Sequence, residues 1–205
     1  MEKLQYISQG YTKEEQALNI FNALDAGVKW IQVRWKNAPE QELIELCEKA
    51  QLLCADYKAI CIINDHIQIA KKINADGVHL GLNDTSVLEA RQILGTGKII
   101  GGTANTLDDV LQRMSEPCDY IGLGPLRFTS TKEKLSPILG FEGYQQLIKD
   151  LKVRSFDVPK IFAIGGVKLD DVELLQQMGI YGVAVSGQIT SQPSIVNEIK
   201  NVLNE

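Results

Sequence analysis

An apolar run that ends in an amide and a carboxylate stands at Ala59-Ile60-Cys61-Ile62-Ile63-Asn64-Asp65-His66. Five consecutive apolar residues are typical of a strand that is buried on both faces, as in a parallel sheet. Burying a charge is costly unless something pairs with it, so the Asp65 carboxylate either reaches solvent or binds a cation. The run therefore predicts a buried strand with polar chemistry directly at its carboxyl end.

Outside this run, short β-rich segments alternate with longer segments of helical spacing along the whole chain. The pattern predicts strands at residues 4–7, 30–33, 59–63, 77–80, 98–101, 120–123, 160–164 and 181–185. It predicts helices at residues 12–27, 39–57, 67–73, 106–114, 141–151 and 193–203, one that begins at Ser86, and one that carries Leu169, Val172, Leu175 and Met178 on its inner side. The sequence thus predicts eight strands and eight helices.

This alternation predicts an α/β fold with one domain over residues 1–205, because no boundary rich in Pro, Gly or Ser divides the chain. Alternating strands and helices imply parallel βαβ units, and eight of them indicate a (β/α)8 TIM barrel. The alternative is a doubly wound open sheet, which usually carries a glycine-rich dinucleotide loop after its first strand. The segment Ser8-Gln9-Gly10-Tyr11 has no such pattern, so the barrel is favoured.

Composition excludes several classes of function. The 44% of hydrophobic residues fits a globular protein, and no apolar run approaches the length of a membrane span. The N-terminus lacks a signal-peptide pattern, so we expect a cytoplasmic protein without a membrane partner. The net charge of −5 argues against nucleic acid as a partner, although local Lys and Arg can still bind an anion. The four cysteines form no CxxC pair and are expected to be small buried hydrophobes.

In a barrel, the chemistry belongs at the carboxyl ends of the strands. The period of two along the second strand and its continuation places Gln32, Arg34 and Lys36 on one face. The opposite, apolar face holds Ile31, Val33 and Trp35. The apolar face must meet the helices, so the polar face points into the barrel mouth. Arg34 and Lys36 together would bind an anion there, although Lys36 could instead extend into solvent.

The third and fourth strands lead into Asp65 and Asp84. Each aspartate also precedes a predicted helix, so each could be only an N-cap. Adjacent strand ends would nevertheless bring both carboxylates near each other and near Arg34 and Lys36, and two bare carboxylates would repel. Magnesium would relieve this repulsion, since it typically takes one or two carboxylates and completes its shell with water and phosphates. His79 lies within the fourth strand and is expected to be a hydrogen-bonded core residue.

The loops after the later strands predict a second anion site. Three hydroxyl residues and Lys132 follow the sixth strand, where they could bind a phosphate or form a solvated loop. Gly165-Gly166 and Ser186-Gly187 follow the seventh and eighth strands, which commonly bind phosphate in barrels of this kind. Glycine there allows backbone N–H groups to approach an anion closely.

Taken in order along the chain, these motifs resemble the thiamine phosphate synthase family. The matching motifs are Gln32-x-Arg34-x-Lys36, Ile63-Asn64-Asp65, Gly77-Val78-His79-Leu80-Gly81-x-x-Asp84, Gly122-x-Gly124-Pro125-x-x-x-Thr129-Ser130-Thr131-Lys132 and Ala163-Ile164-Gly165-Gly166. The resemblance implies a (β/α)8 transferase of thiamine biosynthesis. Such an enzyme joins hydroxymethylpyrimidine diphosphate to a thiazole phosphate and releases pyrophosphate.

The resemblance also implies a role for each matching residue. The residues that would hold the pyrimidine diphosphate are Gln32, Arg34, Lys36, Asn64 and Lys132, with Thr103 near the pyrimidine ring. Those that would bind Mg²⁺ are Asp65 and Asp84. The residues that would hold the thiazole phosphate are Thr129, Thr131, Gly166, Val185 and Ser186. Stabilisation of the departing diphosphate would fall to Arg34, Lys36 and Lys132. The implied partners are these two small molecules and a possible second copy of the chain.

Three positions depart from the family pattern. Trp35 stands where the family often carries an acidic residue, and Thr103 stands where it commonly has a serine. The end of the eighth strand is one residue shorter than usual, which leaves open whether Ser186 or the Gly187 backbone meets the phosphate.

Two other functions stay open at the level of sequence. A related thiazole tautomerase uses a histidine soon after the fifth strand, where this chain has Asn105. A non-catalytic sensor of phosphate ligands could also use the inherited barrel. The long polar loop 128–139 is the candidate for a lid over the site.

Overall fold

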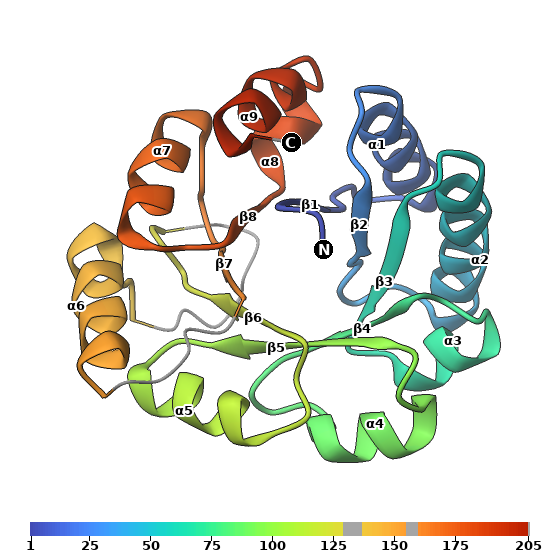
Figure 1. The fold of residues 1–205 in the computed structure, drawn as a ribbon. Coiled ribbons are helices and arrows are strands. Elements are labelled where there is room, and N and C mark those ends of the chain that lie inside the picture. The colour runs from blue at the N-terminus through green and yellow to red at the C-terminus, as the bar shows by residue number, and fades with distance from the viewer. Residues whose placement is uncertain (129–136, 155–159, 205) are drawn as a thin grey trace.

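The computed structural model describes residues 1–128, 137–154 and 160–204. Eight parallel strands close into a barrel in sequential order, and helices surround them (Figure 1). The strands are β1 (Leu4–Ile7), β2 (Trp30–Val33), β3 (Ile60–Asn64), β4 (Gly77–Leu80), β5 (Ile99–Ala104), β6 (Tyr120–Leu123), β7 (Ile161–Ala163) and β8 (Gly182–Val185). The barrel closes where β1 pairs with β8, with Tyr6 opposite Val185. The predicted (β/α)8 barrel is confirmed.

The described residues form nine helices, one more than the sequence predicted. They are α1 (Lys13–Asp25), α2 (Glu40–Asp56), α3 (Ile67–Lys72), α4 (Val87–Leu94), α5 (Leu107–Ser115), α6 (Gly140–Val153), α7 (Leu169–Met178), α8 (Gly187–Ser191) and α9 (Ile195–Leu203). The prediction of eight helices was wrong because α8 is barely longer than one turn, too short to show a helical period. This helix follows β8 and contacts both α1 and α9.

Two separate apolar regions stabilise the barrel. The larger one lies between strands and helices and includes Ile31 and Val33, with Trp35 packed against it, as the alternation along β2 predicted. The smaller one lies inside the barrel and consists of Trp30, Ile62, Tyr120 and Phe162. The Trp30 ring packs edge-to-face on Tyr120 and Phe162, with centroid distances of 4.9 and 5.0 Å. The barrel interior is therefore a packed core and not a pore.

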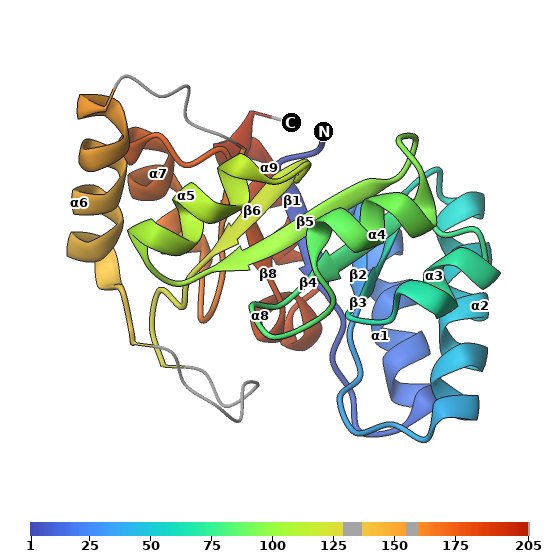
Figure 2. The ribbon, with the colours of Figure 1, turned by 90° about the horizontal axis from the view of Figure 1, so that it is seen from below.

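This interior core leaves the carboxyl half of the barrel to polar residues. Trp30 and Tyr120 begin their strands, whereas Gln32 and His79 lie two positions further along theirs. Gln32 and His79 are buried together with Gln5 and Thr103, so a polar layer covers the aromatic one. The view turned by 90° shows α8 directly after β8, at one end of the barrel (Figure 2). The candidate site residues are therefore expected in this polar layer and on the loops that follow it.

Cys47, Cys54 and Cys61 are buried free thiols, and Cys118 is partly buried. Burial raises the pKa of the Cys47 thiol to about 12, which keeps it protonated and unreactive. Among the described residues, no helix combines the length and apolar character that crossing a bilayer requires.

Candidate active site

Arg34 lies directly after β2, and neighbouring elements hold its backbone on two sides. Its N–H donates to Ser8 Oγ at 2.9 Å, and its carbonyl accepts from Gln16 Nε2 at 3.3 Å. Burial lowers the pKa of the Arg34 guanidinium, while the negative charge of Asp65 raises it in part. A guanidinium stays charged in proteins, so Arg34 and Asp65 attract each other across the ends of β2 and β3.

Asp65 turns the chain at the end of β3. Its φ of 63° lies in the left-handed region, which Asn and Asp adopt more readily than most side chains. Its N–H donates to the His79 carbonyl at 2.9 Å, so this turn is fixed to β4. The turn brings the Asp65 carboxyl group beside that of Asp84, which follows β4.

The two carboxyl groups influence each other strongly. The pKa of Asp65 is raised to about 7. Burial is the largest cause, followed by a hydrogen bond with the Asp84 carboxyl group and by the negative charge of Asp84. The positive charges of Lys36 and Arg34 oppose this shift in part. Lys36 is exposed but still acts on the pair. The structure therefore brings Arg34, Lys36, Asp65 and Asp84 together at one end of the barrel.

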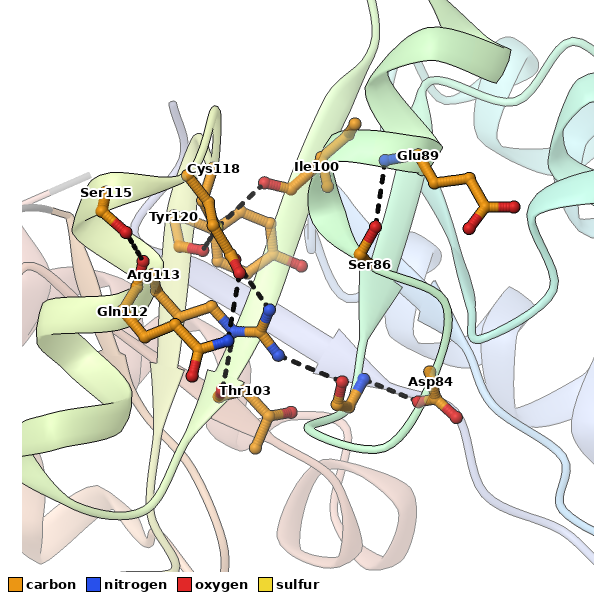
Figure 3. A network of polar contacts seen from close by, with 12 residues as sticks. Asp84, Ser86, Glu89, Ile100, Thr103, Gln112, Arg113, Ser115, Cys118 and Tyr120 are labelled. Atoms are coloured by element: carbon orange, nitrogen blue, oxygen red, sulfur yellow. Dashed lines mark hydrogen bonds and ion pairs between the residues drawn. The ribbon is translucent and has the colours of Figure 1, made fainter.

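Neither aspartate serves as a helix cap. Asp84 Oδ2 accepts from the Gly81 N–H at 2.7 Å, and Ser86 caps α4 instead by accepting from the Glu89 N–H at 3.2 Å (Figure 3). The residue at the cap position of α3 is His66. The interpretation of both carboxylates as N-caps was therefore wrong.

The donor set of this pair fits a magnesium ion. Within residues 1–128, 137–154 and 160–204, no group of three or more His, Cys, Asp or Glu could hold a metal. A site made by protein ligands alone, as zinc prefers, is thus absent from that part of the chain. Two neighbouring carboxyl groups instead match the one or two that Mg²⁺ takes beside water and phosphates. Asp65 and Asp84 are therefore the residues that could bind this metal.

A chain of hydrogen bonds crosses the polar layer from β2 to β5. Gln32 Nε2 donates to Gln5 Oε1 at 3.0 Å, and Gln5 Nε2 donates to the Tyr120 hydroxyl at 3.2 Å. His79 Nδ1 lies 3.0 Å from the same hydroxyl, and its Nε2 lies 3.0 Å from Thr103 Oγ1. His79 is thus a hydrogen-bonded core residue, as expected. The chain connects two residues predicted to hold the pyrimidine, Gln32 and Thr103.

Arg113 supports the same region from outside the strands. Its guanidinium donates to the carbonyls of Thr103 and Gly81, both at 3.1 Å, and pairs with Glu116 at 2.8 Å (Figure 3). It thereby joins the end of β5 to the turn that holds Asp84. Sequence reasoning missed Arg113, Gln5 and Tyr120. A polar residue on an otherwise apolar face was the available signal, but it does not identify the partner.

Two glycines shape the loop after β7. Gly165 and Gly166 have φ values of 84° and 74°, which strongly favour glycine. A Cβ on Gly166 would lie 2.5 Å from Arg127 Cγ, so this glycine also permits a close contact. At the end of β8, the Ser186 hydroxyl donates to Gln9 Oε1 at 3.3 Å, directly before α8.

Part of the predicted site lies outside the described residues. This part contains Thr129, Thr131, Lys132 and most of the candidate lid 128–139. Asn64 ends β3 next to Asp65 and is buried, and Val185 ends β8. Val185 belongs to the apolar region between strands and helices, whereas the other described site residues lie in the polar layer or on the loops that follow it.

A cavity of about 520 Å³ opens beside Asp65, between α2, α3 and α4. Its lining includes Glu40, Glu89 and His66 but no lysine or arginine. A diphosphate needs positive charge, so this cavity does not suit it. Arg34 and Lys36, whose positive charges act on Asp65, could supply the charge that a diphosphate needs.

The chain is similar to known proteins over most of its length. A model of the family "Thiamine monophosphate synthase" matches residues 5–189. The chain is 57% identical over 188 residues to the thiamine-phosphate synthase of Flavobacterium psychrophilum, covering 92% of this chain and 91% of that protein. Its identity to the corresponding protein of Flavobacterium johnsoniae is 55%, covering 92% and 88%. A solved thiamine phosphate pyrophosphorylase from Pyrococcus furiosus superposes with a TM-score of 0.81 at 26% identity, covering 98% and 95%. The chain belongs to the thiamine monophosphate synthase family.

Proposed function

We propose that this chain is a transferase that couples hydroxymethylpyrimidine diphosphate to a thiazole phosphate, giving thiamine phosphate and pyrophosphate. Membership of the family and the names of its relatives support this reaction. The observation that carries the proposal is the convergence of two cationic side chains and a carboxylate pair at the barrel mouth. That combination suits a diphosphate with its magnesium ion.

The chemistry requires stabilisation of a leaving group. The bond between the pyrimidinylmethyl carbon and the diphosphate oxygen breaks, and its electron pair leaves with the diphosphate. The lone pair of the thiazole nitrogen then forms the new C–N bond. Arg34 and Lys36, with Lys132, would stabilise the negative charge that grows on the diphosphate. Magnesium, bound by Asp65 and Asp84, would supply further positive charge there.

The polar layer would orient the pyrimidine. Gln32 donates its amide N–H to Gln5, so its carbonyl oxygen remains to accept from the amino group of the ring. Thr103 would contact the pyrimidine from β5, and Asn64 would contact the diphosphate. The cation that forms on loss of diphosphate is stabilised by the aminopyrimidine itself, so no side-chain nucleophile is needed. The contribution of the protein is then positioning and electrostatics.

The thiazole phosphate would bind at the ends of β6, β7 and β8. Thr129 and Thr131 would donate from the first loop, Gly166 from the second, and the Val185-Ser186 turn from the third. Either the Ser186 hydroxyl or the Gly187 backbone N–H would meet the phosphate. The Ser186 hydroxyl already donates to Gln9. The homo-oligomer and the cytoplasmic location also stay predictions.

One observation argues against the tautomerase alternative. At the place where that enzyme has a histidine, Asn105 is buried and donates from Nδ2 to the Gly124 carbonyl. An amide cannot act as a base near neutral pH, so this position offers no proton transfer.

A single assay distinguishes the three functions. Both phosphorylated substrates are mixed with Mg²⁺, and thiamine phosphate and pyrophosphate are measured. Coupling supports the synthase and its absence refutes it. Isomerisation of the thiazole would favour the tautomerase, and binding without turnover would favour a sensor.

A further inference from the structure

An ion pair joins Arg127, in the segment after β6, to Asp171 in α7, which lies 44 positions later in the sequence. The Arg127 guanidinium forms a bidentate ion pair with the Asp171 carboxylate. Nη2 donates to Oδ1 at 2.8 Å, and Nη1 donates to Oδ2. Nη1 also donates to the Gly166 carbonyl at 2.7 Å. Asp171 is almost completely buried in the first turn of α7, and its Oδ2 also accepts from the Lys168 N–H at 2.8 Å. The pair therefore holds both ends of the turn between β7 and α7.

The charges of this pair depend on each other. Burial alone would raise the pKa of the Asp171 carboxyl group, but hydrogen bonds from Arg127 and the Lys168 N–H lower it below its usual value. The same interaction raises the pKa of Arg127. A bidentate pair of this kind fixes direction as well as distance. The Phe141 ring, with its centroid 5.9 Å from the guanidinium carbon, supports the group from α6.

The backbone of Arg127 acts on the same turn. Its N–H donates to the Gly165 carbonyl at 3.1 Å, while its side chain holds the Gly166 carbonyl. Both carbonyls are thus turned toward Arg127. Because a trans peptide is planar with N–H opposite C=O, the N–H groups of Gly166 and Val167 point away from Arg127. The left-handed φ of both glycines places these two successive N–H groups on the same side of the turn, where both could donate to one anion.

We propose that Arg127, held by Asp171, is a positioning residue for the thiazole phosphate, because it fixes the two peptide planes that present these N–H groups. The inference rests on the proposed function. It adds a residue pair that the matching motifs do not specify, and it predicts an effect confined to one substrate. In the sequence, Arg127 also stands two positions before Thr129, one of the other proposed phosphate contacts.

The test compares the KM values of the two substrates in Arg127→Gln and Asp171→Asn. Asn at 171 can still accept from the Lys168 N–H, so the start of α7 is preserved. We expect the KM for the thiazole phosphate to rise about tenfold or more, and that for the pyrimidine diphosphate to change less than about twofold. Arg127→Lys, which keeps the charge without the fork, should restore part of the loss.

A matched control exists at the opposite end of the strands. Arg91 pairs with Asp119 at 2.6 Å, and Asp119 likewise accepts a backbone N–H, from Ile100 at 2.8 Å. Arg91→Gln should leave both KM values unchanged. Equal shifts for both substrates, or none, in the Arg127 and Asp171 variants would overturn the inference. If Arg127→Gln does not fold, Arg127→Lys and Asp171→Asn give the same comparison.

Calorimetry separates this inference from the proposed reaction. Titration of wild-type protein with the thiazole phosphate, and with the same thiazole lacking its phosphate, measures the phosphate contribution without turnover. We expect Arg127→Gln to lose affinity only for the phosphorylated ligand. An inactive wild-type protein that still shows this loss would refute the synthase and retain the positioning role. An active one without the loss would refute the positioning role alone.

Discussion

Asp65 combines three properties that each cost free energy: a left-handed backbone, partial burial, and a second carboxylate beside it. A non-glycine residue in such a conformation costs on the order of 1 kcal/mol, and persists only where the surroundings enforce it. Burial and the neighbouring carboxylate both disfavour its charged form. Strain and a perturbed carboxylate at the same residue are typical of functional sites. A divalent cation would turn the repulsion between Asp65 and Asp84 into attraction.

Alanine substitutions test this carboxylate pair. We expect Asp65→Ala and Asp84→Ala each to lower magnesium-dependent turnover by about 100-fold or more, because the leaving diphosphate loses its bound cation. Neither residue caps a helix, so the free energy of unfolding should change by only about 1 kcal/mol. Asp108→Ala, at an exposed acidic residue in the first turn of α5, is the control and should keep full turnover. Normal turnover in both site variants would refute the magnesium site.

The pKa of Asp65 also predicts a pH dependence for the metal-free protein. Folding raises the pKa from the ordinary 3.8 to about 7, so the folded state binds more protons than the unfolded state between these values. The contribution of Asp65 to the unfolding free energy should therefore be fully present below about pH 4 and be lost as the pH rises through about 7. The melting temperature in EDTA measures this, with Asp65→Asn as the comparison. If the melting temperature of Asp65→Asn falls equally steeply with pH, other groups cause the effect.

At the scale of elements, the strands position the site by their order around the barrel. The hydrogen-bond chain from Gln32 to Thr103 takes one residue each from β1, β2, β4, β5 and β6. No two of its members are adjacent in sequence. The barrel brings them together because side chains that point inward from neighbouring strands share one layer.

Removing the Tyr120 hydroxyl should interrupt this chain. We expect Tyr120→Phe to raise the KM for the pyrimidine diphosphate about fivefold to tenfold and to leave that for the thiazole phosphate nearly unchanged, because Gln32 loses its orientation. Tyr144→Phe is the matched control, since Tyr144 is a buried tyrosine of α6 whose hydroxyl donates to the Leu123 carbonyl. Steady-state kinetics with each substrate varied in turn measure the two KM values. Equal KM changes in the two variants would show that the chain has no positioning role.

The sequence predicted elements well where a local signal exists. The alternation of β2 correctly separated Ile31 and Val33, which face the helices, from Gln32, which faces inward. Local signals failed for α8, which is too short for a period, and for β5, which extends to Ala104 and thereby includes Thr103. Glycines at 101 and 102 hid that extension because they carry no side-chain pattern.

The candidate site was predictable only in part, for a physical reason. Arg34, Asp65 and Asp84 could be identified because charges at strand ends are conspicuous. Arg127 and Asp171 could not be paired in advance, since 44 positions separate them and the bond depends on how two loops meet. Long-range polar contacts of this kind follow from the completed fold and leave no periodic signal in the chain.

At the scale of the whole molecule, the barrel separates stability from chemistry along its axis. The aromatic core inside it occupies the amino-terminal half, and the polar layer with the strand-end loops occupies the other. Substitutions in the aromatic core should therefore affect the free energy of unfolding. Substitutions in the polar layer and the strand-end loops should affect substrate binding. Trp30 offers the sharpest test, because its ring contacts residues of both β6 and β7.

Trp30 contributes packing, but its Nε1 is buried without a hydrogen-bond partner in the described part of the chain. Trp30→Ala should lower the unfolding free energy by about 3–5 kcal/mol, because it leaves a cavity among the other three buried side chains of this core. Trp30→Phe loses some contact but also removes the unpaired donor, which costs about 1–3 kcal/mol when buried. We therefore expect Trp30→Phe to lie within about 1 kcal/mol of the wild type, and both KM values of this variant to be unchanged. Urea unfolding at pH 7 measures the two free energies, with Trp35→Phe on the helix side as the control. If Trp30→Phe destabilises the protein as much as Trp30→Ala, ring shape and not an unpaired donor governs this core.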